Sequence, residues 1–173
     1  MQETSVNNIN ASCFQRFLAL PGALLIGLLT LSTSLPLLAD ALSDPPANWQ
    51  NKLQPVPEPD LSGSEPAARK AIIQTRERLA ELLAGGTTEV PRLAAGYGQL
   101  AALYQLSRID APAALCWDNA RQLQPDEFRW SYYAGYLALK RGHTEIALAA
   151  LQRARDLKPD YAPLDLRLAQ LWL

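Results

Sequence analysis

Residues that could do enzyme chemistry are few in this chain and are not grouped. His143 is the only histidine, and it follows Gly142 at a predicted turn, where an imidazole is usually solvated rather than part of a triad. Paired imidazole ligands and Cys/His zinc sites need several such residues at short spacing. The acidic residues are scattered, and no pair is expected in an apolar pocket that would separate their pKa values. We predict no catalytic residue, no metal site and no enzymatic activity.

One stretch matches a cofactor motif. GYGQLA, from Gly96 to Ala101, fits the glycine fingerprint of dinucleotide-binding proteins. That fingerprint needs a strand before it and a helix that starts at it, whereas residues 91–106 are predicted to form one continuous helix. We therefore predict no cofactor, and an enzyme would need a cofactor or residues supplied by a partner.

Aromatic residues are the remaining candidates for a functional site. FRWSYYAGYLALKRGH, from Phe128 to His143, holds one Trp and three Tyr within seven positions. Tyr and Arg side chains are frequent anchors of protein interfaces, because they combine apolar area with hydrogen-bonding groups. Aromatic residues at helical spacing also fill cores, so the stretch is either a binding surface or packing.

Composition and charge narrow the class of partner. The chain has 173 residues, 49% of them apolar, which is typical of one globular domain. Its net charge of -1 provides no basic field for nucleic acid and no polybasic patch for a membrane surface. We expect a protein or peptide partner and no nucleic acid.

The first 41 residues have the pattern of a secretory signal peptide. A long apolar run follows Arg16 and ends in Ala39-Asp40-Ala41, a small-residue cleavage pattern, so cleavage is expected after Ala41. A stretch of this length could also remain as an N-terminal membrane anchor, which would then be the chain's contact with a membrane. Either alternative predicts a periplasmic or secreted protein.

The segment that follows, residues 42–64, is predicted to be a disordered linker. Six prolines occur from Leu42 to Pro66, with Pro66 included, and the apolar residues show almost no period. Such segments stay extended because they bury too little apolar surface to fold. Trp49 within it is either incidental or a docking residue.

Residues that typically begin and end helices occur at regular places after the linker. Ser64 is expected to cap a first helix, which Gly85 and Gly86 end. Pro125 and Pro159 then stand 34 residues apart in the similar contexts QLQPDE and DLKPDY. A repeat of this length indicates stacked helical hairpins. Asp110 and Thr144 are expected to cap the second helix of each hairpin.

With this period, residues 65–173 resemble the tetratricopeptide-repeat (TPR) family. One unit places Tyr97, Leu100, Ala101, Tyr104, Ala113, Trp117, Ala120 and Pro125 at the family's signature positions; the next places Ala134, Gly135, Ala147, Leu151, Ala154 and Pro159 there and departs at Ser131 and Ala138. Small residues at these places let paired helices approach closely. The resemblance implies an all-α solenoid with one leading helix, two full repeats and one half repeat.

The resemblance also implies a binding groove lined by the first helix of each unit. The groove positions fall on Gln99, Arg129, Tyr132, Tyr133, Tyr136, Lys140 and Arg167. Trp130 and Ala134 are expected to point toward neighbouring helices instead. The family's clamp for a terminal carboxylate uses Lys and Asn, whereas Gly98, Ala102, Tyr133 and Pro163 stand at its places and only Arg167 is compatible. That clamp is not expected here.

A third unit begins at Ala162 and lacks a second helix, which leaves the apolar LRLAQLWL near the end of the sequence. Repeat arrays need polar terminal units, so we expect either a truncated chain or self-association through this helix. The preferred hypothesis is an exported scaffold that binds a protein segment and assembles envelope complexes. The alternative is the N-terminal structural part of a larger multi-repeat envelope protein whose active domain lies beyond residue 173.

Overall fold

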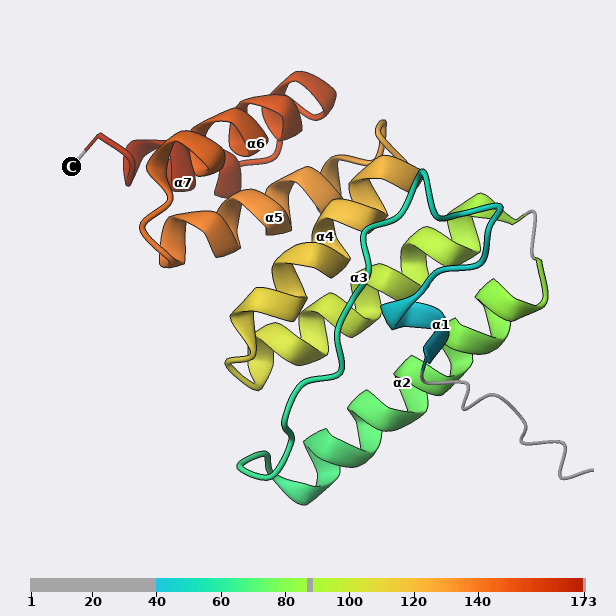
Figure 1. Ribbon diagram of the computed structural model, residues 1–173. Coiled ribbons are helices and arrows are strands. Elements are labelled where there is room, and N and C mark those ends of the chain that lie inside the picture. Colours follow the sequence, from blue (N-terminus) through green and yellow to red (C-terminus); the bar gives the residue numbers. More distant parts are fainter. Residues whose placement is uncertain (1–39, 87–88, 173) are drawn as a thin grey trace, which may run out of the picture. The chain divides into compact units, whose positions relative to one another are not determined.

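The computed structural model describes residues 40–86 and 89–172. Every regular element in these ranges is an α-helix, so the prediction of an all-α fold is confirmed (Figure 1). The helices are α1 (Asp40–Ser43), α2 (Pro66–Ala84), α3 (Val90–Leu106), α4 (Asp110–Leu123), α5 (Phe128–Lys140), α6 (Thr144–Leu157) and α7 (Pro163–Ala169).

The predicted leader, residues 1–41, lies outside the described residues apart from its last two positions, which begin α1. Among the helices that the structure describes, none is both long and apolar enough to cross a membrane.

The helix ends follow local sequence signals, with small shifts at the start. The side chain of Glu65, rather than Ser64, caps α2 by accepting a hydrogen bond from the Ala68 amide at 3.0 Å. Gly85 ends α2 as predicted, and Gly86 follows with a positive φ of 60°, which glycine adopts without strain. Helices α4 and α6 end two residues before Pro125 and Pro159, as expected.

The caps predicted for the second helices are wrong. Asp110 and Thr144 are the first residues inside α4 and α6, and neither helix has a side-chain hydrogen bond at its cap. The turns before them are tight instead: Gly142 has φ of 74°, and Arg108 has φ of 60°. The sharp turns therefore set where these helices start.

Successive helices pack in pairs. Most contacts between elements join α3 to α4 and α5 to α6, and further contacts join α2 to α3, α4 to α5 and α6 to α7. Small residues permit the close approach: a Cβ added at Gly135 of α5 would lie 2.7 Å from Cγ of Leu151 in α6. The alanines at 101, 113, 120, 147 and 154 are fully buried, as the repeat predicts.

Two clusters of buried side chains form the core. The larger joins residues of α2, α3 and α4 with Trp130 and Leu137 of α5. The smaller joins Tyr132 of α5 with Leu151, Ala154, Leu164 and Leu168 of α6 and α7. The C-terminal part of the fold is thus held by fewer buried side chains.

The prediction of a disordered linker over residues 42–64 is wrong. This segment, which we call the strap, begins with the last two residues of α1 and then runs across the helices as an irregular chain until α2 begins (Figure 1). Its apolar side chains Leu42, Trp49, Leu53 and Val56 are buried in the larger core cluster. They have no regular period because each fits a space between helices that exists only after α2, α3 and α4 have packed.

Polar contacts also hold the strap. Asn119 of α4 accepts a hydrogen bond from the Gln54 amide at 2.7 Å and donates one to the Gln54 carbonyl at 2.9 Å. Asn119 is completely buried, so this pair satisfies a side chain that would otherwise be costly to place there. The strap is therefore part of the folded domain.

A buried arginine lies beneath the strap. The guanidinium of Arg76 in α2 donates to the Tyr104 hydroxyl at 2.6 Å and to the Pro57 carbonyl of the strap at 3.4 Å. No carboxylate among the described residues forms an ion pair with it.

Burial raises the pKa of the nearby Cys116 thiol, which keeps it protonated and unreactive.

Candidate functional site

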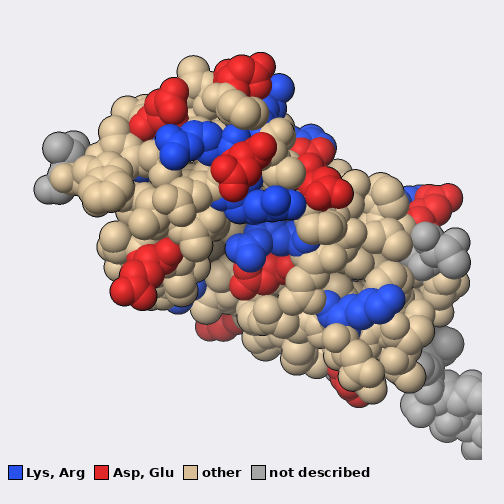
Figure 2. Space-filling model, turned by 90° about the horizontal axis from the view of Figure 1, so that it is seen from above, with Lys and Arg blue, Asp and Glu red and all other residues tan. Residues whose placement is uncertain are grey.

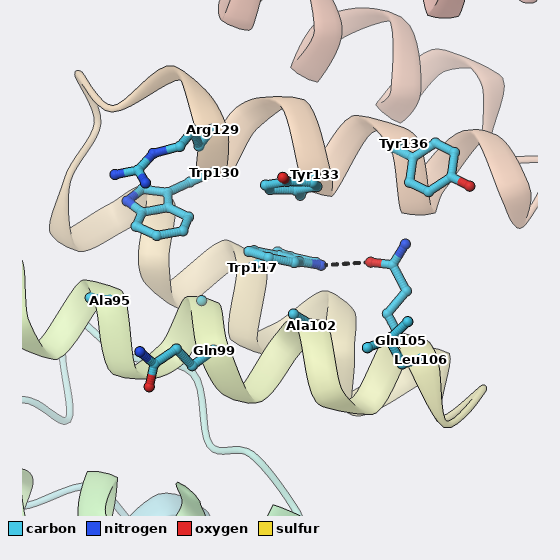
Figure 3. A pocket seen from close by; sticks show the side chains of 11 residues that line it. Ala95, Gln99, Ala102, Gln105, Leu106, Trp117, Arg129, Trp130, Tyr133 and Tyr136 are labelled. Atoms are coloured by element: carbon cyan, nitrogen blue, oxygen red, sulfur yellow. Dashed lines mark hydrogen bonds between the residues drawn. The ribbon is translucent and has the colours of Figure 1, made fainter. Parts of the chain in front are cut away.

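Helices α3, α4 and α5 surround a pocket of about 470 Å³, which we call the aromatic pocket (Figure 3). This volume is within the range of sites that hold ligand-sized groups, about 300–1,000 Å³. The lining residues are mostly apolar or aromatic: Ala95, Gly98, Gln99, Ala102, Gln105, Leu106, Trp117, Arg129, Trp130, Tyr133 and Tyr136.

Stacked rings form the wall of the pocket. The ring of Trp117 in α4 stacks on Tyr133 of α5, with centroids 5.0 Å apart and planes inclined by 20°. Trp117 also stacks on Trp130 with centroids 6.1 Å apart. These offset contacts between rings each add stability beyond the area that they bury. The aromatic wall therefore has one well-defined arrangement.

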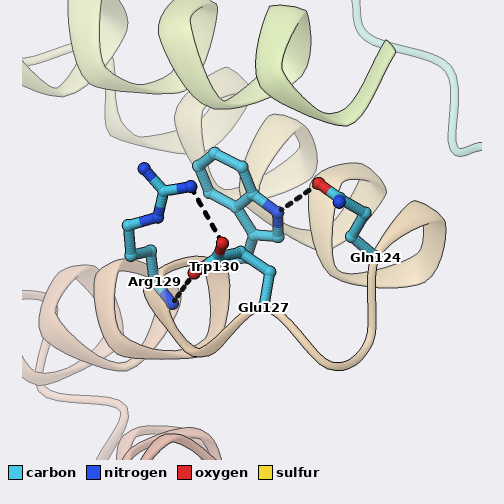
Figure 4. A network of polar contacts seen from close by, with 4 residues as sticks. All are labelled: Gln124, Glu127, Arg129 and Trp130. Carbon is cyan, nitrogen blue, oxygen red and sulfur yellow. Dashed lines mark hydrogen bonds and ion pairs between the residues drawn. The ribbon is translucent and has the colours of Figure 1, made fainter. Parts of the chain in front are cut away.

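Hydrogen bonds orient both indoles. Nε1 of Trp117 donates to Oε1 of Gln105 at 3.1 Å, and Nε1 of Trp130 donates to Oε1 of Gln124 at 3.3 Å (Figures 3 and 4). Each indole thus has its one polar group satisfied by a glutamine. The aromatic faces are left to contact other groups.

Gly98 of α3 makes room for the wall. A Cβ added to Gly98 would lie 2.5 Å from Cζ3 and 2.8 Å from Cη2 of Trp130. Only a residue without a side chain lets the indole lie against this helix. The sequence GYG therefore serves packing in the middle of α3 and does not begin a helix, which agrees with the rejection of a dinucleotide site.

Arg129 stands at one end of the pocket, beside Trp130 (Figure 3). Its guanidinium lies 5.2 Å from the centre of the Trp130 ring and pairs with Glu127 at 2.8 Å. The same carboxylate caps α5 by accepting from the Arg129 amide at 3.2 Å. Hydrogen bonds from the Arg129 side chain lower the pKa of Glu127, so this carboxylate stays ionised.

Two further cations lie beside Tyr136, which lines the pocket at the end away from Arg129 (Figure 3). The Arg167 guanidinium from α7 lies 4.4 Å from the centre of the Tyr136 ring, and Nζ of Lys140 lies 5.9 Å from it. Nη1 of Arg167 donates to the neutral amide of Gln170 at 3.0 Å. Within the described chain, neither cation forms an ion pair with a carboxylate.

Six of the seven predicted binding residues come together. Gln99, Arg129, Tyr133 and Tyr136 line the aromatic pocket, and Lys140 and Arg167 contact the Tyr136 ring. They share this place because positions 129, 133, 136 and 140 recur on one face of α5.

The expectation of an open groove position for Tyr132 is wrong. Tyr132 is 7% exposed, and its ring packs edge-on against Tyr161, with centroids 5.2 Å apart. It lies at the margin of the pocket-facing stripe, where the connection to α7 covers it. A periodic pattern on one helix does not show how far the next element covers its edge.

Sequence reasoning missed several pocket residues. The sequence predicts that Trp130 points toward neighbouring helices and places Trp117 at a signature position of the repeat; both side chains are buried, and both also line the pocket. Leu106, which is 81% exposed, was not assigned at all. An exposed apolar residue such as Leu106 indicates a binding site only once it is known to adjoin a pocket. The signal available in the sequence for the pocket wall was a large aromatic residue, Trp130, and a glycine, Gly98, on different predicted helices.

The surface carries both signs of charge. Figure 2 shows one face, on which Lys, Arg, Asp and Glu side chains are interspersed rather than separated into fields. No group of three or more His, Cys, Asp or Glu side chains in the described ranges could hold a metal ion.

No model of a known protein family matches the chain, and no curated protein matches it.

Proposed function

We propose that this chain is an exported, TPR-like scaffold that binds a segment of another protein in the aromatic pocket. The resemblance to the TPR family and the pairwise packing of α3 with α4 and of α5 with α6 support the repeat. A pocket between the first helices of two successive hairpins is where such a repeat would receive a peptide.

One observation carries the proposal. Four residues selected as groove positions, Gln99, Arg129, Tyr133 and Tyr136, line a single apolar pocket. The pocket leaves large apolar groups in water, because Leu106 is 81% and Tyr133 38% exposed. Exposed apolar area beside a pocket is typical of binding sites.

The lining supports binding rather than catalysis. The pocket is lined by no His, Cys, Asp, Glu, Ser or Thr, so it offers neither a general base with a pKa near neutrality nor a common nucleophile. Rings that are already fixed by stacking lose little side-chain entropy when a partner binds. The pocket is therefore suited to recognition.

Selection from a random dodecapeptide library on the full chain tests the pocket. Peptides that bind are expected to lose about tenfold or more in affinity when Leu106 is changed to Glu, because the charge enters an apolar site. The matched control is Ile146→Glu, since Ile146 of α6 is 59% exposed and does not line the pocket. Equal loss in both variants, or loss in neither, would contradict the proposal.

The second part of the proposal is export. The exported protein would lie in the periplasm or outside the cell, where it would take part in the assembly of envelope complexes. Alkaline phosphatase fused after residue 173 is expected to be active only when residues 1–41 are present. N-terminal sequencing of the exported protein separates cleavage after Ala41 from a retained anchor. Phosphatase activity without residues 1–41 would rule out this leader.

A further inference from the structure

We infer that the occupant of the aromatic pocket is a short extended segment with large apolar side chains flanked on both sides by carboxylates. The inference rests on the proposed binding function and specifies the chemistry of the partner. It follows from the charges at the two ends of the pocket and from the spacing of the two aromatic residues, Trp130 and Tyr136, over which those charges lie.

The first step is the sign of the charge. Arg129 is the one charged residue among those that line the pocket, and Lys140 and Arg167 stand at the Tyr136 ring. Among the described residues, Glu127 is the carboxylate that forms an ion pair with a pocket residue, Arg129, at 2.8 Å. An anionic partner therefore gains attraction at both ends, and a cationic one is repelled.

The second step excludes a quaternary ammonium ligand. Several aromatic rings around one pocket are also the pattern of cages for such cations. Here protein cations already lie over two of the rings, Arg129 at 5.2 Å from Trp130 and Arg167 at 4.4 Å from Tyr136. Another cation would meet like charge at both places.

The third step is spacing. Trp130 and Tyr136 are six residues apart on α5, which corresponds to about 9 Å along the helix axis at 1.5 Å per residue. An extended chain covers about 3.3–3.6 Å per residue, so the two flanking carboxylates belong to residues about three positions apart in the bound peptide. The apolar side chains lie between them, against Trp117 and Tyr133.

The two ends differ in strength. Arg129 forms an ion pair with Glu127, whereas within the described part of the chain the side chain of Arg167 donates only to the neutral Gln170 amide, and Lys140 forms no hydrogen bond or ion pair. We therefore assign the stronger carboxylate contact to the end formed by Lys140 and Arg167. This arrangement differs from a clamp for a terminal carboxylate, because internal acidic side chains satisfy it.

Isothermal titration of the full chain with synthetic peptides tests the inference. The probe is acetyl-Ser-Glu-Phe-Leu-Glu-Ser-amide, and its analogues replace both Glu by Gln, both Glu by Lys, or Phe-Leu by Ser-Ser. The Gln analogue is expected to bind about fivefold or more weakly, since exposed ion pairs contribute modestly, and the Lys analogue more weakly still. The Ser-Ser analogue should not bind.

Variants locate the charge contact. Lys140→Gln and the double change Lys140→Gln with Arg167→Gln should reduce the preference for the acidic probe over its Gln analogue. Arg155→Gln is the control, because Arg155 is an exposed residue of α6 that does not line the pocket. Lys140 is exposed, so its single variant tests the inference even if the change at Arg167 disturbs packing.

The outcomes separate the two proposals. If the Gln or Lys analogues bind as tightly as the probe and Leu106→Glu abolishes binding, the acidic pattern is overturned while peptide binding stands. Binding of phenyltrimethylammonium, or of the Ser-Ser analogue at the affinity of the probe, also overturns it. If neither these peptides nor library peptides bind, both proposals fail.

Discussion

The tightest single fit in the pocket is that of Gly98 against Trp130. An added Cβ at 2.5 Å from the indole is closer than real contacts, so any side chain must displace the ring or the helix. The same indole forms part of the pocket wall. One glycine therefore links the packing of α3 on α5 to the shape of the binding site.

Gly98→Ala is expected to destabilise the fold by about 1–2 kcal/mol, because overpacking outweighs the better helix propensity of alanine. Urea denaturation followed by tryptophan fluorescence measures the change. Gly63→Ala is the control: nothing lies within 4 Å of an added Cβ there, so its stability should stay within about 0.5 kcal/mol. Equal effects of the two changes would contradict the packing role.

A second prediction at this scale concerns alkaline pH. Burial raises the pKa of Tyr104 to about 12 from its ordinary 10.0, although the Arg76 charge opposes the shift. The contribution of this pKa shift to the free energy of unfolding is complete below pH 10. It falls as the pH rises toward 12, because the unfolded chain then loses the Tyr104 proton that the folded chain keeps. Burial also raises the pKa of Tyr97.

Tyr104→Phe should therefore make the fall in melting temperature between about pH 10 and 12 less steep. At neutral pH the same variant should be less stable by about 1–3 kcal/mol, because Arg76 loses the hydroxyl that accepts its hydrogen bond at 2.6 Å. Melting curves by circular dichroism measure both effects. An unchanged alkaline slope would show that Tyr104 does not titrate in this range.

At the scale of elements, the strap completes the core. It covers apolar side chains of α2, α3 and α4 that would otherwise face water. An apolar helix face at the end of a stack of helices needs such a cover, and here an irregular segment supplies it. The two hydrogen bonds between Asn119 and Gln54 fix its position.

Asn119→Ala is expected to lower the free energy of unfolding by about 1–3 kcal/mol, since it leaves both backbone groups of Gln54 without this partner. Hydrogen exchange should accelerate at the amides of Gln54 and Val56 before it does in α3. The control is Gln122→Ala, at an exposed position of α4. The prediction fails if exchange in the strap is the same in both variants.

For the whole molecule, stability is expected to decrease toward the C-terminus. The cluster that holds α7 contains five buried residues, whereas the larger cluster includes side chains of the strap and of four helices. Because each helix is held mainly by contacts with its neighbours in the sequence, α7 should exchange its amide protons first and α3 and α4 last. Native-state hydrogen exchange with mass spectrometry measures this order, and uniform protection would contradict it.

Self-association through the C-terminal helix stays a prediction. Trp172 is 79% and Leu166 58% exposed. If they form an interface, Trp172→Ser combined with Leu166→Ser should shift sedimentation of the full chain toward the monomer, since the changes remove apolar contact area. The same sedimentation profile for wild type and variant would exclude this interface.

The sequence by itself determined the helices after residue 65 and four of the residues that line the candidate site. Helix ends depend on local residues such as Gly85, Pro125 and Pro159, and the face shared by positions 129, 133 and 136 follows from the geometry of one helix. These are short-range properties, so they could be predicted before any packing was known.

Only the tertiary structure decided that the strap and Tyr132 are buried and that the indoles of Trp117 and Trp130 line the pocket. Leu42, Trp49, Leu53 and Val56 fit spaces between helices that no local pattern encodes. Tyr161 covers Tyr132 from a following unit, and the pocket wall needs Trp117 and Gly98 from different helices. Contacts between residues distant in sequence depend on how helices stack, which periodicity within one helix does not contain.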